Sequence, residues 1–194
     1  MKKIMFNDQY GLTQAVLEDR KTQTRRIAYQ EPFKYNCNCG FFTEGKDKGK
    51  FAINDGNEIV AKSTYKIGEV VAVAQRYGDI PFTDELYIEK NISEGWTNKM
   101  FVKASLMPHQ IKITNIRCER LQDISTDDCM KEGILCSHID GIDDAYSYDA
   151  TNDSFEKKWW YRTPIEAYKM LSCKLHLHWD INPLVFVYDF VLVK

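Results

Sequence analysis

A basic cluster lies near the start of the chain, in the stretch DRKTQTRRI at residues 19–27. Four cations stand there within seven residues, interleaved with hydroxyl and amide side chains: Arg20, Lys21, Arg25 and Arg26. Such cations bind anionic or polar groups of a ligand. If the chain runs extended from residue 22, successive side chains point to opposite faces, with Thr24 and Arg26 on one face and Arg25 on the other. The stretch therefore predicts one wall of a ligand cleft.

An apolar pattern before the cluster predicts a short helix. Leu12, Ala15 and Val16 recur at helical spacing and are followed by charge, so the helix should end near Asp19. Cations at a helix end also suit the helix dipole and are commonly no more than a solvated face. The basic cluster therefore has a purely structural interpretation beside the functional one.

The composition predicts one globular domain that spans residues 1–194. Hydrophobic residues make up 44% of the chain and charged residues 28%, which excludes a disordered or fibrous protein. The formal net charge is −2, so attraction for nucleic acid must come from a local patch. Residues 140–156 carry only acidic charges, so the two ends of the chain differ electrostatically.

The sequence contains no recognisable export or membrane signal. The N-terminus has only a short mixed run after two lysines, and no apolar run is long enough to span a membrane. These features predict a cytoplasmic protein without membrane contact, whose six cysteines are reduced thiols. The spacings Cys37-x-Cys39 and His176-x-His178 differ from those of usual zinc sites, so we expect neither a metal nor a cofactor.

Four segments predict strands, at residues 70–74, 98–106, 110–121 and 183–193. In the third segment the apolar phase shifts, as a bulge near Asn115 would cause. Strands outnumber helices, and the two do not alternate steadily as they would in a parallel sheet. The predicted fold class is therefore α+β: a small, mostly antiparallel β-barrel with flanking helices.

Two helices are predicted by their caps. The segment ISTDDCMKEGI has Ser125 as N-cap and Gly133 as the stop. The segment TPIEAYKMLSCKL has Thr163 as N-cap, Pro164 at the first helical position and Glu166 completing a capping box.

Two further segments fall outside this pattern. Residues 31–60 are rich in Gly, Asn and Lys and predict loops and a hairpin around KFAI rather than core, so we treat them as an insertion. Residues 137–162 predict a long acidic loop. Docking of a protein partner through the insertion, as in a phage accessory protein, is one function open to the chain.

The order of four segments resembles the ASCH-domain family of the PUA-like superfamily, in its bacterial and bacteriophage branch: EDRKTQTRRI, YKIGEVVAV, RLQDISTDDCMKEGI and PLVFVYDFVLV. The family signature is G-x-K-x-x-E-x-R, and its positions are occupied here by Asp19, Lys21, Thr24 and Arg26. Asp19 thus replaces the glycine and Thr24 replaces the glutamate. Asp is tolerated where a helix exits through a left-handed residue. The resemblance implies a PUA-like barrel.

At the substituted position the chain is similar to small bacterial N4-acetylcytidine amidohydrolases, which have Lys-x-x-Thr there. The resemblance implies Thr24 as nucleophile, Lys21 as its activator and Glu132 as the acid that completes the site. A threonine hydroxyl needs a base, and lysine can be that base only if burial or another cation lowers its pKa. Glu132 would face the negative end of a helix dipole at a cost of about 0.3–1 kcal/mol, so either a partner such as Lys21 offsets that cost or Glu132 is simply solvated.

PUA-like barrels commonly bind RNA or modified nucleosides, so the first expectation is a cleft that binds RNA or a nucleobase-containing ligand. Arg20, Arg25 and Arg26 would contact the ligand, and Tyr77 would stack on a base. An amidohydrolase acting on an acylated nucleoside is the alternative. Ordinary structural roles stay open beside the binding and amidohydrolase hypotheses, because threonine is common in strands and a tyrosine is commonly a packing residue.

Overall fold

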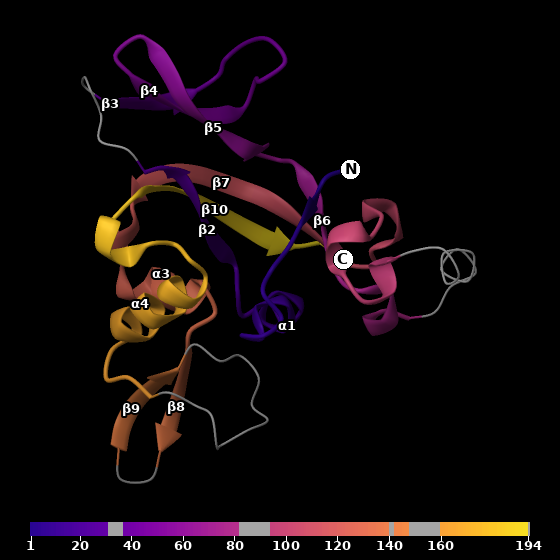
Figure 1. Ribbon diagram of the computed structural model, residues 1–194, viewed down its shortest axis with the longest axis vertical. Coiled ribbons are helices and arrows are strands. Elements are labelled where there is room, and N and C mark those ends of the chain that lie inside the picture. The colour runs from indigo at the N-terminus through magenta and orange to yellow at the C-terminus, as the bar shows by residue number, and fades with distance from the viewer. Residues whose placement is uncertain (31–36, 82–93, 140–141, 148–159, 194) are drawn as a thin grey trace.

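The computed structural model describes residues 1–30, 37–81, 94–139, 142–147 and 160–193 (Figure 1). Its main sheet has five strands, in the order β1 (Lys3–Ile4), β6 (Val70–Val73), β7 (Gln110–Arg120), β10 (Leu184–Leu192) and β2 (Gln23–Tyr29). The pairs are antiparallel except β1 with β6, which run parallel.

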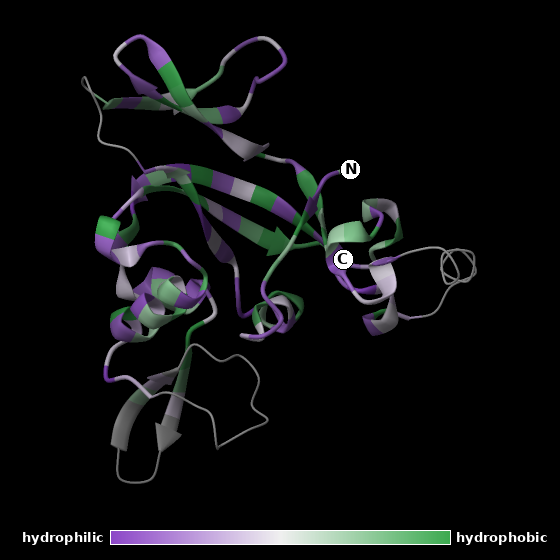
Figure 2. Ribbon diagram, in the orientation of Figure 1, coloured by the Kyte–Doolittle hydropathy of each residue, from purple (hydrophilic) through white to green (hydrophobic). Residues whose placement is uncertain are grey.

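The centre of the main sheet is the long pair β7 and β10. Aromatic and β-branched residues alternate along β10, and Val185 and Val187 are fully buried because both faces of the strand are covered. Hydrophobic segments follow both strands in Figure 2. The register between them shifts between Asp189 and Phe190, opposite Asn115 and Ile113, which confirms the predicted bulge.

A second, three-stranded sheet lies over the main sheet, at the top of Figure 1. It consists of β3 (Cys37–Phe41), β4 (Lys50–Asp55) and β5 (Glu58–Lys66). Aromatic pairs join the layers: the ring centroids of Phe51 and Phe186 lie 6.2 Å apart and those of Tyr65 and Tyr188 lie 5.3 Å apart.

The predicted hairpin around KFAI is therefore confirmed as β4 with its neighbours. The expectation that the segment 31–60 stays outside the core is wrong, because Ile53 is fully buried in the main core. Strand β5 of this sheet also continues past residue 60 to Lys66. Residues 31–36 lie outside the described part of the chain.

Among the described residues, three α-helices pack below and beside the main sheet in Figure 1: α1 (Leu12–Leu17), α3 (Thr126–Lys131) and α4 (Pro164–Lys174). The predicted N-caps are confirmed, since the Asp128 N–H donates to Ser125 and the Glu166 N–H donates to Thr163, each at 3.2 Å. The Glu166 side chain accepts from the Arg162 N–H at 3.2 Å rather than from Thr163, so the predicted capping box is not formed as expected. No helix among the described residues is long and apolar enough to span a membrane.

Short 3-10 turns link these elements: η1 (Tyr77–Asp79), η2 (Glu94–Trp96), η3 (Lys99–Phe101), η4 (Ala104–Leu106), η5 (Leu121–Asp123) and η7 (Trp179–Ile181). The strand predicted at residues 98–106 is wrong, because η3 and η4 occupy that segment. The Asn98 side chain accepts a hydrogen bond from the Met100 N–H and caps the first turn, which favours a turn over a strand.

The predicted acidic loop 137–162 is partly replaced by a hairpin of β8 (Leu135–Ile139) and β9 (Ile142–Ser147). The rest of that segment contains residues 140–141 and 148–159, which lie outside the described part of the chain.

The α+β class is confirmed, but the closed barrel is not. Among the described residues, β1 and β2 remain the two edges of an open main sheet, and the other strands form separate sheets. Because β1 pairs over only Lys3 and Ile4, it offers too short an edge to close a barrel.

The Ser125 cap provides a test of how firmly α3 is held. Replacing Ser125 by alanine removes the acceptor for the Asp128 N–H and should lower the free energy of unfolding by about 1 kcal/mol. Urea denaturation measures the change. Thr126→Ala, at the exposed next position, is the matched control and should change stability by less; equal losses in the two variants would contradict the capping role.

Candidate functional site

A pocket of about 260 Å³ opens beside the start of β2. One part of its wall is apolar and includes Phe6, Leu12, Leu175 and Leu177. The other part carries functional groups from three distant segments: Asn7, Lys21, Thr24, Arg25, Arg26 and Glu132. The pocket therefore brings all three residues of the predicted catalytic set onto one wall.

The end of α1 places Lys21 in this wall. Asp19 adopts a left-handed conformation with φ 56°, as expected for the residue that replaces the family glycine. The N–H groups of Arg20 and Lys21 then both donate to Ala15 O at 2.9 Å, which turns the chain directly from helix to strand. The turn directs the Lys21 side chain into the protein rather than toward solvent.

Lys21 forms a buried ion pair with Glu132, the C-cap residue of α3. Lys21 Nζ lies 2.5 Å from Glu132 Oε2 and 2.8 Å from the Glu132 carbonyl oxygen. The two side chains are only 2% and 4% exposed, so water does not screen their attraction. The pair joins segments that are 111 residues apart in the chain.

Burial lowers the pKa of Lys21 below its ordinary value, although Glu132 acts in the opposite direction. The positive charges of Arg26 and Arg25 lower it further. Burial or another cation was the expected cause of a lowered pKa if lysine is to act as a base. Both act on Lys21 in the expected direction.

Arg25 lies behind the pocket wall with a side chain that is completely buried. Its guanidinium donates five hydrogen bonds: to Gln23 and Glu132 through Nη1, to Glu119 and Asp128 through Nη2, and to Glu119 through Nε. Burial would lower its pKa, but Glu132 and the other acidic neighbours outweigh this and raise it. Every N–H of the guanidinium thus has a protein acceptor, and none remains for a ligand.

The acceptors of Arg25 belong to a larger ionic network that the sequence analysis missed. Arg117 Nη2 lies 2.5 Å from Asp128 and Arg117 Nη1 lies 3.1 Å from Asp189. Gln23 donates to Asp189 at 2.6 Å and so closes the network against β10. The only sequence signal was strand alternation, which places Gln23 beside Arg25 on the face opposite Thr24.

Thr24 is buried, and its backbone pairs with Tyr188 in β10. Within the described ranges its hydroxyl has no hydrogen-bond partner, and no hydrogen bond joins it to Lys21. A hydroxyl that lines a pocket without a protein partner is available to a ligand.

Of the remaining predicted residues, Arg26 lies at the pocket rim and Arg20 lies outside the pocket. Arg26 is exposed at the rim, donates to Met5 O at 2.6 Å and lies 5.9 Å from the Phe6 ring. Arg20 pairs with Glu18 and does not line the pocket.

Tyr77 also lies elsewhere, in a second apolar cluster. It is 1% exposed, packs against Trp96 at 6.0 Å and accepts a hydrogen bond from the Lys103 N–H at 2.8 Å. Its ring is therefore a packing residue that cannot stack on a ligand base without leaving this cluster.

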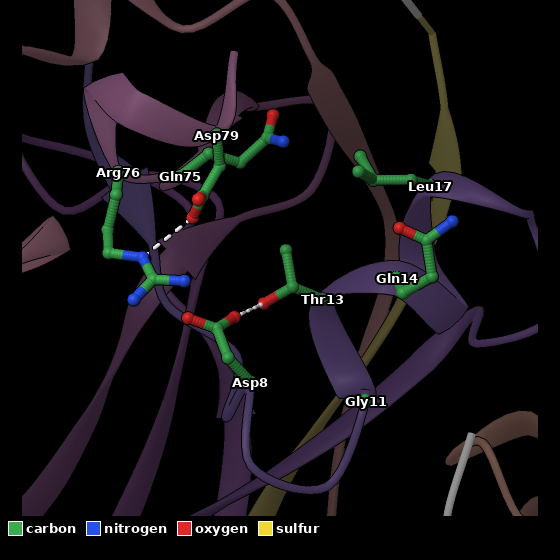
Figure 3. Close-up of a pocket in the computed structure, with 8 residues that line it drawn as sticks. All are labelled: Asp8, Gly11, Thr13, Gln14, Leu17, Gln75, Arg76 and Asp79. Carbon is green, nitrogen blue, oxygen red and sulfur yellow. Dashed lines mark hydrogen bonds and ion pairs between the residues drawn. The ribbon is translucent and has the colours of Figure 1, made fainter. Parts of the chain in front are cut away.

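A second pocket of about 230 Å³ lies along α1 and faces η1 (Figure 3). Its polar and charged side chains interact with one another: Thr13 donates a hydrogen bond to Asp8 at 2.5 Å, and Arg76 forms an ion pair with Asp79 at 2.7 Å. None of the predicted site residues lines it.

No group of three potential His, Cys, Asp or Glu ligands is arranged to hold a metal among the described residues. Comparisons with models of protein families, with curated proteins and with solved structures gave no match. What the chain does is therefore inferred from the geometry of the pocket.

The Lys21–Glu132 pair can be tested by a double-mutant cycle. Glu132→Gln leaves a buried lysine without its partner and should cost about 3–5 kcal/mol of unfolding free energy. In the Glu132→Gln variant, Lys21→Met should cost less unfolding free energy than it does in the wild-type protein, because it removes the unpaired charge. The coupling free energy should be about 0.5–3 kcal/mol. Urea denaturation of the four proteins measures this coupling.

Arg76 and Asp79 form the matched control pair, since both side chains are 45% exposed. Their cycle, with Arg76→Met and Asp79→Asn, should give a coupling below about 1 kcal/mol. Additive effects at Lys21 and Glu132 would show that the two side chains do not form the buried pair.

Proposed function

We propose that the chain is a hydrolase that removes an acyl group from an amide carried by a small, uncharged, nucleobase-containing molecule. One observation carries the proposal: the unpartnered Thr24 hydroxyl shares the wall of one small pocket with the buried Lys21–Glu132 pair. Threonine supplies a nucleophile, and a lysine with a lowered pKa supplies the base that nucleophile needs.

The reaction would proceed through an ester on Thr24. Neutral Lys21 takes the hydroxyl proton while the Thr24 oxygen bonds to the amide carbonyl carbon, and the carbonyl oxygen takes up the negative charge. Collapse of this tetrahedral species breaks the C–N bond, and the Lys21 ammonium returns the proton to the leaving nitrogen. Water, deprotonated by Lys21, then attacks the ester carbon, the C–O bond to Thr24 breaks, and the Lys21 ammonium returns the proton to the Thr24 oxygen. The net reaction consumes one amide and one water and yields an amine and an acid.

Glu132 would position Lys21 rather than touch the substrate. Its Oε2 and its carbonyl oxygen each accept a hydrogen bond from Nζ, while Arg25 holds Oε1 at 3.0 Å. These contacts hold the Lys21 nitrogen from the side of α3 and set the direction of its lone pair. A base held by its neighbours loses little conformational freedom when it reacts.

The charge balance of the pocket favours an uncharged ligand. Arg25 has no free N–H, and Lys21 is neutralised by Glu132, so among the described lining residues only Arg26 at the rim offers a phosphate group a cation that no carboxylate pairs. Phe6 and the leucines of the wall supply apolar contact for a flat, weakly polar molecule. The same balance argues against an RNA chain held through its phosphates.

We also propose that the chain is a divergent member of the ASCH family with a PUA-like ancestry. The order of the four segments supports this, and so does the left-handed conformation of Asp19 at the position of the family glycine. The open main sheet would then be a modification of the barrel.

The hydrolase proposal is tested with N4-acetylcytidine as substrate and mass spectrometry of the nucleoside as readout. Thr24→Val keeps the shape of the strand residue but removes the hydroxyl, so turnover should fall at least about 100-fold. Thr22→Val, two residues earlier and directly before β2, is the control for loss of a nearby threonine hydroxyl and should retain turnover. Equal rates for wild type and Thr24→Val would refute the role of Thr24.

The pH dependence of turnover provides an independent check. Because Lys21 must be neutral to act as base, the rate should rise with pH until Lys21 has lost its proton. The lowered pKa of Lys21 places this rise below the ordinary titration range of lysine. A rate that falls steadily as pH increases would contradict a lysine base.

Binding without turnover is the second candidate, and one observation favours it: both hydrogen bonds of Lys21 go to Glu132 rather than to Thr24. Equilibrium dialysis with cytidine and N4-acetylcytidine would then give affinity that Thr24→Val leaves unchanged. Little dependence of this affinity on salt is expected, whereas an affinity for RNA that falls steeply with salt would indicate phosphate contacts instead.

A further inference from the structure

Two exposed cysteines lie side by side on β3, at the free edge of the upper sheet. Cys37 and Cys39 are two residues apart in a strand, so their side chains point to the same face. Their Sγ atoms lie 3.9 Å apart. Rotation of the side chains and a small movement of the strand would bring the two sulfurs to bonding distance.

A third thiol, Cys118 of β7, borders this pair from the main sheet. Burial, together with the charge and hydrogen bonding of the neighbouring Cys39 thiol, raises its pKa to about 12. Cys118 therefore remains a protonated, weakly reactive thiol. The exposed pair on β3 is the part of the cluster that solutes can reach.

We propose that Cys37 and Cys39 form an oxidation site that reacts with hydroperoxides and closes reversibly to a disulfide. This inference is independent of the hydrolase proposal, since neither cysteine lines the pocket of Lys21 and Thr24.

The first step oxidises Cys39. Burial and the neighbouring Cys39 raise the pKa of Cys37, so Cys37 is the less reactive thiol of the pair and Cys39 is assigned the reaction with peroxide. The Cys39 thiolate bonds to one peroxide oxygen and the O–O bond breaks. The second oxygen leaves with a proton as water, or as an alcohol from an organic hydroperoxide, and Cys39 becomes a sulfenic acid.

The second step closes the ring. The Cys37 sulfur gives up its proton and attacks the Cys39 sulfur, so that the S–S bond forms and the S–O bond breaks. The departing hydroxide takes up the proton and leaves as water. Two thiols and one hydrogen peroxide thus give one disulfide and two waters, and an organic hydroperoxide gives one water and one alcohol instead. The two sulfurs lose two electrons in total.

The strand geometry makes the disulfide easy to reduce. Residues two apart in an extended strand have Cα atoms about 6.6–6.8 Å apart, at the upper limit of the range that disulfides usually span. Closing the bond therefore requires β3 to pucker away from its pairing with β4, where Cys39 faces Ile53. Strained disulfides are the labile ones, so a dithiol reductant should reopen this bond.

The experiment treats the reduced full-length chain with one equivalent of hydrogen peroxide, alkylates the free thiols and maps the tryptic peptides by mass spectrometry. Cys37 and Cys39 lie in one tryptic peptide, which should lose two hydrogen atoms and both alkylation sites. Dithiothreitol should restore both. Cys173, exposed on α4, is the internal control and should stay alkylated.

Two variants sharpen the assignment. Cys37→Ser should stop the reaction at Cys39 sulfenic acid, which dimedone captures, whereas Cys118→Ser should leave disulfide formation unchanged. Alkylation of Cys37 and Cys39 to the same extent as Cys173 after peroxide treatment would overturn the proposal. A cross-link between Cys39 and Cys118 would overturn it as well, because the partners would then be different.

Discussion

The buried ion pair of Lys21 and Glu132 is the interaction on which the rest of the site depends. It ties the turn before β2 to the end of α3, and so fixes the polar wall of the pocket from two distant parts of the chain. A buried pair is costly to desolvate, and it persists only when further hydrogen bonds satisfy both partners. Arg25 and the carbonyl oxygen of Glu132 provide these bonds.

The same network decides what the basic cluster can do. Four cations in seven residues suggest a surface for phosphate, yet Arg25 turns inward and donates four of its hydrogen bonds to acids of β7 and the α3 segment and the fifth to Gln23. Most of the positive charge is therefore used in holding the fold. What remains available in the pocket is a hydroxyl, a lysine with a lowered pKa and an apolar wall, which suit chemistry on a neutral molecule.

Local signals predicted much of this arrangement, the family resemblance alone led to the expected pairing of Lys21 with Glu132, and the other long-range contacts could not be predicted. Ser125 marked the start of α3 because its capping bond spans three residues, and Asp19 marked the end of α1 because a left-handed residue is a local property. The meeting of Lys21 with Glu132 follows from the packing of α3 against β2, which no local pattern encodes. The open edge at β1 likewise depends on strand pairing, so the closed barrel was wrong where the individual strands were mostly right.

The most direct test of the central claim is to look for the ester on Thr24. The protein is mixed with N4-acetylcytidine, quenched in acid within the first turnover and weighed intact, and the modified peptide is then sequenced by mass spectrometry. The account predicts a mass increase of one acetyl group located at Thr24 and absent from Thr24→Val. Turnover without any acetylated protein, or an acetyl group that persists in Thr24→Val, would contradict it.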